Sequence, residues 1–154
     1  MQKLRKQNLI TRYLPKLRVL QRSPRHKAKN TKQIGMKTAQ DPRHKKRQLA
    51  IQELFSLTFH NQSVSEGTSE IVKYKEKIDE QIQKAAPNFP VEKINRIDLS
   101  VLRLATYEIL VRAKEPQNVI IDEAVELAKE YGQDTSPAFI NGVLGKIVTY
   151  AKIS

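Results

Sequence analysis

An all-α fold is predicted by the sequence, and three observations support that prediction. Apolar residues recur at every third or fourth position along most of the chain after residue 41, which is the period of amphipathic helices. Proline and glycine fall between these periodic segments and separate them. No pair of alternating segments predicts a strand pair, and no internal repeat is present. We therefore expect a compact helical bundle over residues 42–154, preceded by a basic, disordered N-terminal arm over residues 1–41.

The chain has 154 residues and a net charge of +12, and this charge is concentrated near the N-terminus. Residues 1–35 contain eleven of the 28 Lys and Arg residues and no Asp or Glu. The rest of the chain contains the other 17 basic residues and all 16 acidic residues, so it is nearly neutral. A positive field confined to one part of a protein favours a polyanionic partner that approaches from that side. The charge distribution therefore predicts a nucleic acid or another acidic surface as partner.

Composition also argues against several classes of protein. The chain has no cysteine, which excludes disulfides, thiolate zinc sites and cysteine nucleophiles and is compatible with a reducing cytosol. No apolar run approaches the roughly 20 residues of a membrane span. Residues 1–20 lack the continuous apolar region of a secretory signal. We expect a cytoplasmic protein without a membrane segment.

Residues 1–41 allow three interpretations. They form an RNA-binding arm, they precede a true translation start at Met36, or they are a transit peptide. The basic, acid-free composition fits a transit peptide, but the scarcity of Ser does not. Residues 21–41 contain almost nothing that could be buried, so we expect them to be disordered in isolation.

The segment from Arg43 to His60 is predicted to form the first helix of the bundle. It begins with five consecutive basic residues, RHKKR. Its second half carries an apolar stripe at helical spacing, formed by Ala50, Ile51, Leu54, Phe55, Leu57 and Thr58. Such a helix is held by its apolar half and presents positive charge from its first turns, which suits the binding of phosphates.

A second helix is predicted over Ser69–Ala86, with Ser69 as its N-cap. Two prolines, Pro87 and Pro90, end it. A short helical turn is expected at residues 91–95 before the next helix begins.

The third main helix is predicted over residues 96–112. It is apolar on nearly all sides, which is typical of a helix at the centre of a bundle. We expect its charged residues Arg103 and Glu108 to pair with another helix.

The last third of the chain predicts a short extended run and two helices. The run is Val119–Ile121, and Asp122 is placed to cap the helix that follows, which ends at Gly132 in the C′ position. Ser136 as N-cap and Pro137 as first helical residue begin the final helix. Its packing residues are predicted to be Phe139, Ile140, Val143, Leu144, Ile147 and Tyr150.

Four motifs, INRID, LRLATYE, IDEAVELAK and FINGVLGK, occur in this order. The series resembles the NusB family of bacterial transcription antitermination factors, and the resemblance extends over residues 42–152. It implies the all-helical NusB bundle. It also implies binding of the boxA element of nascent ribosomal RNA together with NusE, a small-subunit ribosomal protein. NusA, NusG and RNA polymerase join that complex in the family, so that ribosomal operons are read through.

The resemblance also implies an RNA-binding surface. The matching positions are Arg43, His44, Lys45, Lys46, Arg47, Gln52, Phe55, Asp98, Phe139 and Asn141. Independently of the resemblance, single-stranded RNA needs cations for its phosphates and flat groups on which its bases stack. No cofactor, metal or catalytic residue is expected.

Some of these positions have a purely structural alternative. Phe55 lies on the apolar stripe and fits the core, and Asp98 fits the capping of a helix N-terminus. Gly142 and Gly145 are expected to allow close helix packing. The segment between the first helix and Pro87 is shorter than in longer family members, which leaves the family's homodimer interface and part of its partner surface open.

Other functions compete with antitermination. A ribosome-associated structural RNA-binding protein would need the same basic arm. The NusB-like domain of an rRNA methyltransferase is disfavoured because no glycine-rich cofactor loop is present. Catalysis is disfavoured because the three histidines lie away from carboxylate clusters. Asp122, Glu123 and Glu126 share one helix, where capping and solvent exposure suit them better than metal binding.

Overall fold

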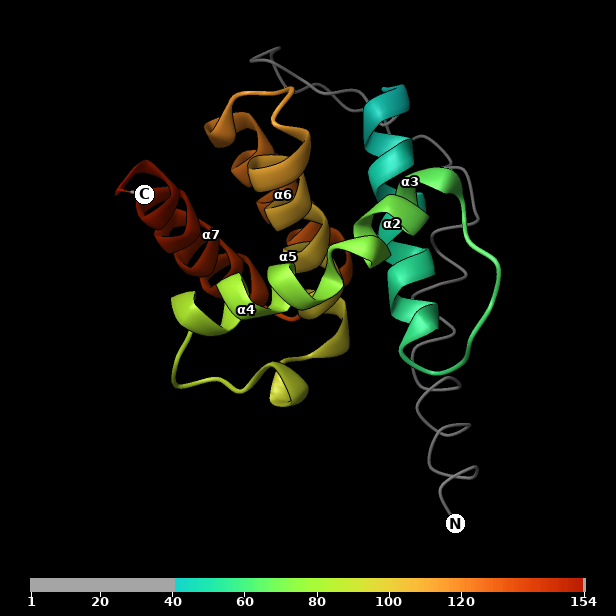
Figure 1. The fold of residues 1–154 in the computed structure, drawn as a ribbon, viewed down its shortest axis with the longest axis horizontal. Helices are drawn as coiled ribbons and strands as arrows, with labels where there is room; N and C mark the ends of the chain where they lie inside the picture. Colours follow the sequence, from blue (N-terminus) through green and yellow to red (C-terminus); the bar gives the residue numbers. More distant parts are fainter. Residues whose placement is uncertain (1–40, 154) are drawn as a thin grey trace. The chain divides into compact units, whose positions relative to one another are not determined.

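The computed structural model describes residues 41–153, and every regular element in that range is helical (Figure 1). The elements, in chain order, are α2 (Pro42–Leu57), α3 (Glu66–Lys73), α4 (Lys75–Ala85), the 3-10 helix η1 (Val91–Lys93), α5 (Arg96–Tyr107), the π-helix η2 (Glu108–Arg112), α6 (Gln117–Tyr131) and α7 (Ser136–Ile153). The all-α prediction is confirmed for this part of the chain. The predicted arm lies, apart from Asp41, outside the described residues.

The contacts of the chain divide it into two units, Met1–Leu49 and Ala50–Ser154, and the division falls inside α2. In the second unit, α5 packs against α4, α6 and α7, and α6 packs against α7 (Figure 1). The largest fully buried side chains of α4 to α7 are Ile78, Ile82, Leu99, Val101, Leu102, Ile120, Leu127, Ile140, Leu144 and Ile147. The predicted boundary between residues 41 and 42 stays a prediction.

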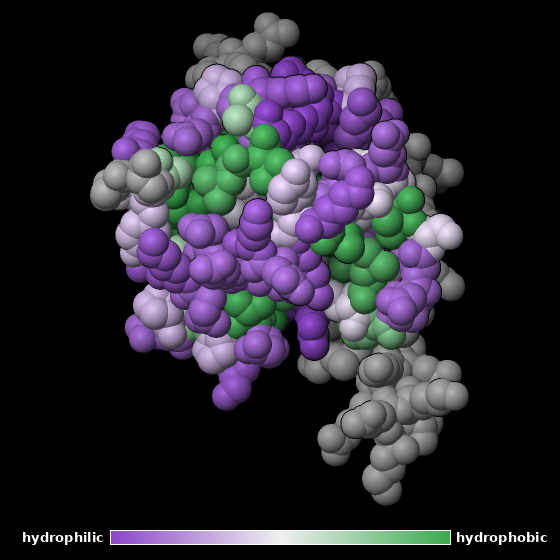
Figure 2. Space-filling view, viewed as in Figure 1, coloured by the Kyte–Doolittle hydropathy of each residue, from purple (hydrophilic) through white to green (hydrophobic). Residues whose placement is uncertain are grey.

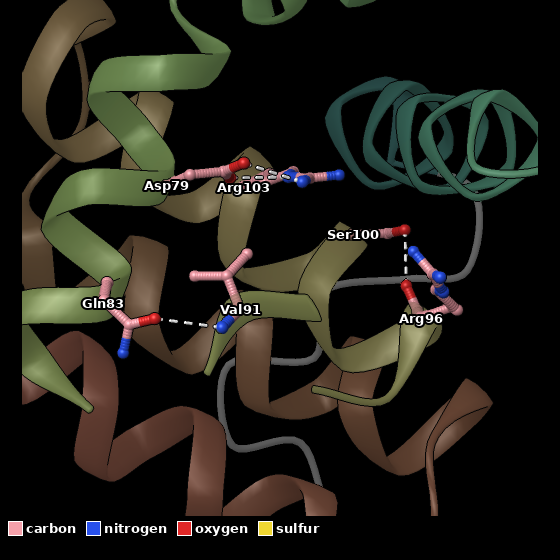
Figure 3. A network of polar contacts seen from close by, with 6 residues as sticks. All are labelled: Asp79, Gln83, Val91, Arg96, Ser100 and Arg103. Carbon is pink, nitrogen blue, oxygen red and sulfur yellow. Dashed lines mark hydrogen bonds and ion pairs between the residues drawn. The ribbon is translucent and has the colours of Figure 1, made fainter. Parts of the chain in front are cut away.

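The central position of α5 is confirmed, because every residue from Ile97 to Thr106 is buried. The helix begins after Asn95, whose side-chain oxygen accepts a hydrogen bond from the Ile97 N–H at 2.9 Å. Arg103 donates from Nε and Nη2 to the two oxygens of Asp79 on α4, each at 2.8 Å (Figure 3). The predicted pairing of Arg103 with another helix is therefore confirmed. The bidentate geometry satisfies both carboxylate oxygens, which a partly buried ion pair requires.

The single helix predicted over Ser69–Ala86 is wrong, since the structure has two helices there. Tyr74 separates α3 from α4 with φ −100° and ψ 7°, and its N–H bonds to Ile71 O at 3.1 Å. Its ring packs 6.1 Å from that of Tyr107. Neither Gly nor Pro marks this break. Ser69 lies inside α3, and Ser65 precedes the helix instead.

Glu53 on α2 connects that helix to the start of α3. Its carboxylate accepts hydrogen bonds from the Ser65 N–H at 3.0 Å, from Ser65 Oγ at 2.7 Å and from the hydroxyl of Thr68. Burial raises the pKa of Glu53, but the hydrogen bonds from Thr68 and Ser65 outweigh it, so the pKa lies below its usual value. The carboxylate is therefore ionised at neutral pH, in the form that these donors stabilise.

The extended run predicted at Val119–Ile121 is also wrong. Pro116 precedes the first residue of α6, Gln117, so these residues are helical and Ile120 is buried. Asp122 consequently lies inside the helix rather than capping it. The β-branched run has only a weak preference against helix, and burial of its apolar side chains outweighs that preference.

Glycine has a structural role at one of the predicted positions. Gly132 follows α6 with extended backbone, and a Cβ there would lie 2.6 Å from Cβ and Oγ of Ser136. The close approach of α7, rather than a left-handed conformation, therefore requires glycine. At Gly142 and Gly145 a Cβ would meet nothing within 4 Å. The expectation that these two glycines allow close helix packing is wrong.

Candidate nucleic-acid interface

The basic run begins α2, and the residue before it fixes the first turn. Asp41 Oδ1 accepts a hydrogen bond from the Arg43 N–H at 2.9 Å, and Asp41 O accepts one from the Lys45 N–H at 3.2 Å. Asp followed by Pro42 is a favourable helix start, because the carboxylate satisfies a free N–H and proline has none to satisfy. The hydrogen bond from the Arg43 N–H lowers the pKa of Asp41 below its usual 3.8. This cap was not predicted from the sequence.

The five basic side chains are not presented together. Arg43, Lys45 and Lys46 are exposed, whereas His44 and Arg47 are buried. The two buried residues are three positions apart and share one side of the helix. Three of the five predicted residues are therefore accessible to a phosphate in this conformation.

The next two predicted positions on α2 are less accessible. Gln52 is half-buried. Phe55 is 1% exposed, and its ring lies edge-to-face against Phe59 with 5.0 Å between ring centroids. A buried ring has no free face for a nucleobase, so the burial of Phe55 supports the core-packing alternative.

Asp98 lies in the first turn of α5 and is buried. The N-cap of that helix is Asn95. Burial raises the pKa of Asp98, and a hydrogen bond with the Ser136 side chain opposes that rise. Its Oδ1 has no hydrogen-bond partner within the part of the chain that the structure describes. Asp98 thus joins the start of α5 to the start of α7. When its carboxyl group is ionised, burial of the charge carries a desolvation cost.

An exposed aromatic residue lies in the loop between α4 and η1. Gln83 holds this loop: its Nε2 donates to Ala86 O at 3.2 Å and to Phe89 O at 3.3 Å, and its Oε1 accepts from the Val91 N–H at 3.1 Å, the last of which is drawn in Figure 3. Phe89 is 54% exposed. Its ring stands edge-to-face against that of Phe139 on α7, with centroids 5.2 Å apart and planes at 66°. Phe139 is therefore half-buried beneath a second ring that the sequence analysis missed.

The two predicted residues of α7 point in different directions. Phe139 and Asn141 are two positions apart on a helix, so their side chains leave the axis about 200° apart. Phe139 meets the loop that follows α4, and Asn141 is exposed. An RNA that touched both would have to pass around α7. RNA binding at these residues stays a prediction.

A cavity of about 310 Å³ in the second unit offers no pair of carboxylates or histidines for acid–base chemistry. Its lining residues are Leu54, Leu57, Thr58, Asn61, Ile71, Val72, Lys75, Ile78, Arg96 and Arg103. The guanidinium of Arg103 is already paired with Asp79. Among residues 41–153, no three His, Asp or Glu side chains form a cluster that could hold a metal ion.

Comparison with known proteins identifies the fold and the family. The family model described as the NusB family matches residues 36–149. The chain belongs to the NusB family. The structure of T. maritima NusB is similar over 70% of this chain and 91% of that chain, with a TM-score of 0.59 and 29% sequence identity. The family's helical fold is thus confirmed by sequence and by structure.

Curated relatives carry the name transcription antitermination protein NusB. The protein from Geobacter sulfurreducens is 44% identical over 79 residues, which cover 51% of this chain and 57% of the relative. The protein from Clostridium tetani is 53% identical over 70 residues, which cover 46% of each chain. The chain thus spans about half the length of these relatives. Within the described residues, no helix is long and apolar enough to cross a membrane.

Proposed function

We propose that this protein is a transcription antitermination factor that binds the single-stranded boxA element of nascent ribosomal RNA together with NusE. NusA, NusG and RNA polymerase complete the proposed complex, which acts in the cytoplasm and allows ribosomal operons to be read through. The observation that carries the proposal is the match of residues 36–149 to the NusB family. The exposed cations at the capped start of α2 support it.

The chemistry of this helix start suits a phosphate backbone. Arg43, Lys45 and Lys46 offer donors and positive charge to solvent, and each contact between such a group and a phosphate releases a condensed counterion. The positively charged residues 1–35 add long-range attraction. Because phosphate contacts carry no sequence information, recognition of boxA must rest on further groups that touch the bases.

Binding of a short boxA leader RNA at several salt concentrations tests the proposal. Lys45→Ala and Lys46→Ala should each weaken binding and reduce the slope of log affinity against log salt by about 0.7, the value for one phosphate of a single strand. Lys114→Ala, which removes an exposed lysine between η2 and α6, should leave the slope unchanged. Arg47→Ala is not an equivalent test, because Arg47 is buried and its loss also affects the fold. Equal slopes in all three lysine variants would reject this surface.

A read-through assay separates antitermination from simple RNA attachment. A template with a boxA leader and a downstream terminator should show more read-through when this protein, NusE and the other Nus factors are present, and a scrambled boxA should abolish the gain. Binding without read-through would support the alternative, a ribosome-associated RNA-binding protein. Deletion of residues 1–35 should lower affinity for both RNAs alike if the arm supplies only general attraction.

A further inference from the structure

An aromatic and cationic surface lies where α7 meets α4 and the loop after it. We call it the α4–α7 seam and define it by Lys84, Phe89, Phe139, Lys146 and Tyr150. Phe89 supplies an exposed ring, packed edge-to-face on Phe139. The three Gln83 hydrogen bonds hold the loop that carries Phe89. The ring is therefore fixed in place although it faces solvent.

Three residues of the seam form one stripe along α7. Lys146 follows Phe139 by seven positions and Tyr150 follows it by eleven, which places all three within about 40° around the helix. At 1.5 Å per residue the stripe is about 16 Å long. Helix α4 packs against α7 (Figure 1). Lys84 at the end of α4 places its Nζ 5.2 Å from the centroid of the Tyr150 ring, so a cation is positioned at the far end of the stripe from Phe89.

The charge of the seam favours an anion. No Asp or Glu occurs from Ser136 to Ser154, nor from Ala85 to Val91, whereas Lys84 and Lys146 are both exposed. Figure 2 shows hydrophobic surface on both sides of the hydrophilic band over α4. The basic residues 1–35, which contain no acid, are not complementary to it. Helix α4 carries three acids, Glu76, Asp79 and Glu80, of which Asp79 is paired with Arg103. A flat ring beside lysines is the composition of a single-strand binding surface.

We propose that the α4–α7 seam binds unpaired nucleotides of the same RNA that the protein recognises. One base stacks on the exposed face of Phe89, and Lys146 and Lys84 contact the phosphates that follow along α7. The inference rests on the proposed function, because it takes RNA as the ligand. It adds Phe89, Lys84 and Lys146 as base-stacking and phosphate-binding residues. Phe139 supports the Phe89 ring, and Tyr150 positions Lys84.

The test uses the full chain and boxA leader RNAs in which 2-aminopurine replaces one base at a time. Stacking of this base on an aromatic ring quenches its fluorescence. Phe89→Ala should weaken binding about tenfold, the effect of losing one base–aromatic stack, and should remove the quenching at one or two adjacent positions only. Phe89→Tyr should retain both. Leu110→Ala, which shortens another exposed apolar side chain, should change neither the affinity nor the quenching.

Lys84→Ala and Lys146→Ala should each reduce the slope of log affinity against log salt by about 0.7.

The outcomes separate this inference from the proposed function. If Lys45→Ala and Lys46→Ala weaken binding while Phe89→Ala leaves affinity and quenching unchanged, the α2 surface stands and the seam is rejected. If only the seam variants weaken binding, the seam stands and the α2 surface is rejected. If Phe89→Ala instead weakens co-purification with NusE and not RNA binding, the seam is a protein interface and the inference is overturned. An unaltered chain that binds no RNA overturns both.

Discussion

The start of α2 and the α4–α7 seam are both cationic surfaces, but they are built differently. At the start of α2, three exposed side chains project from one helix, and the nearest ring along it, Phe55, is buried. The geometry of this helix start depends on local features, chiefly the Asp41 cap. In the seam, Phe89 packs on Phe139 and Lys84 lies over the ring of Tyr150. These contacts join α7 to α4 and its following loop, which are distant from α7 in sequence.

This difference assigns a different physical role to each surface. Charge on flexible side chains gives attraction that salt weakens and that ignores the base. A ring held by tertiary contacts offers a fixed stacking position, whose contribution is less sensitive to salt. We therefore expect substitutions that disturb tertiary contacts to affect the seam, and substitutions at the helix cap to affect only the start of α2.

The largest effect is expected for Gln83→Ala. It removes three hydrogen bonds from the loop that carries Phe89, and at about 1 kcal/mol per net hydrogen bond the fold should lose about 3 kcal/mol. Chemical denaturation measures this loss. RNA affinity should fall as it does in Phe89→Ala, while the salt slope stays constant. An unchanged RNA affinity in a destabilised variant would show that the fixed position of Phe89 is irrelevant to binding.

A smaller effect, with a sign that depends on pH, is expected for Asp98→Asn. The folded-state pKa of Asp98 is raised by burial, so the folded protein binds this proton more tightly than the unfolded chain. The carboxyl group therefore favours folding below its usual pKa of 3.8, and this contribution is lost as pH rises through the raised value. Asparagine keeps an acceptor for Ser136 without the charge. The melting temperature of the variant should exceed that of the unaltered protein at pH 7, and the difference should shrink toward pH 4. A lower melting temperature at pH 7 would mean that the ionised group is stabilised at the α5 N-terminus.

The smallest effect is expected for Asp41→Ala. The Asp41 side chain accepts a hydrogen bond from the first turn of α2, so amide hydrogen exchange should quicken at Arg43, His44 and Lys45 and remain unchanged in α5 and α7. Because the cap is ionised above its lowered pKa, the protection that it gives is present at neutral pH and lost as pH falls through that value. Asp41→Asn, which keeps an acceptor oxygen, should restore most of the protection. Faster exchange in α7 would contradict a purely local effect of the Asp41 cap.

Much of the fold followed from periodicity. The central helix predicted over residues 96–112 corresponds to α5 and η2, because a segment that is apolar all round must be buried. The two errors in secondary structure share a cause. Tyr74 breaks a helix without Gly or Pro, and Val119–Ile121 is helical despite its β-branched residues. In both places packing decides a backbone that local preference leaves nearly balanced.

The candidate site was predictable in composition but not in presentation. The RHKKR run identified the basic helix start, yet only the structure shows that His44 and Arg47 are buried. Tertiary packing decides which side of a helix faces solvent, and a fully charged run carries no apolar pattern to reveal it. Phe89 was overlooked because it lies between two helix-ending prolines. An aromatic residue in such a loop, with no apolar neighbour at helical spacing, was the feature that could have identified it.

The open space around Gly142 makes this chain unusually simple to label. A Cβ there would meet no neighbouring element within 4 Å, and the chain contains no cysteine. Gly142→Cys would therefore introduce a single thiol, one turn along α7 from Phe139, at which a fluorophore can be attached without removing a competing sulfur. Energy transfer from that fluorophore to a dye on either end of a bound transcript would report the direction in which the strand runs along the helix.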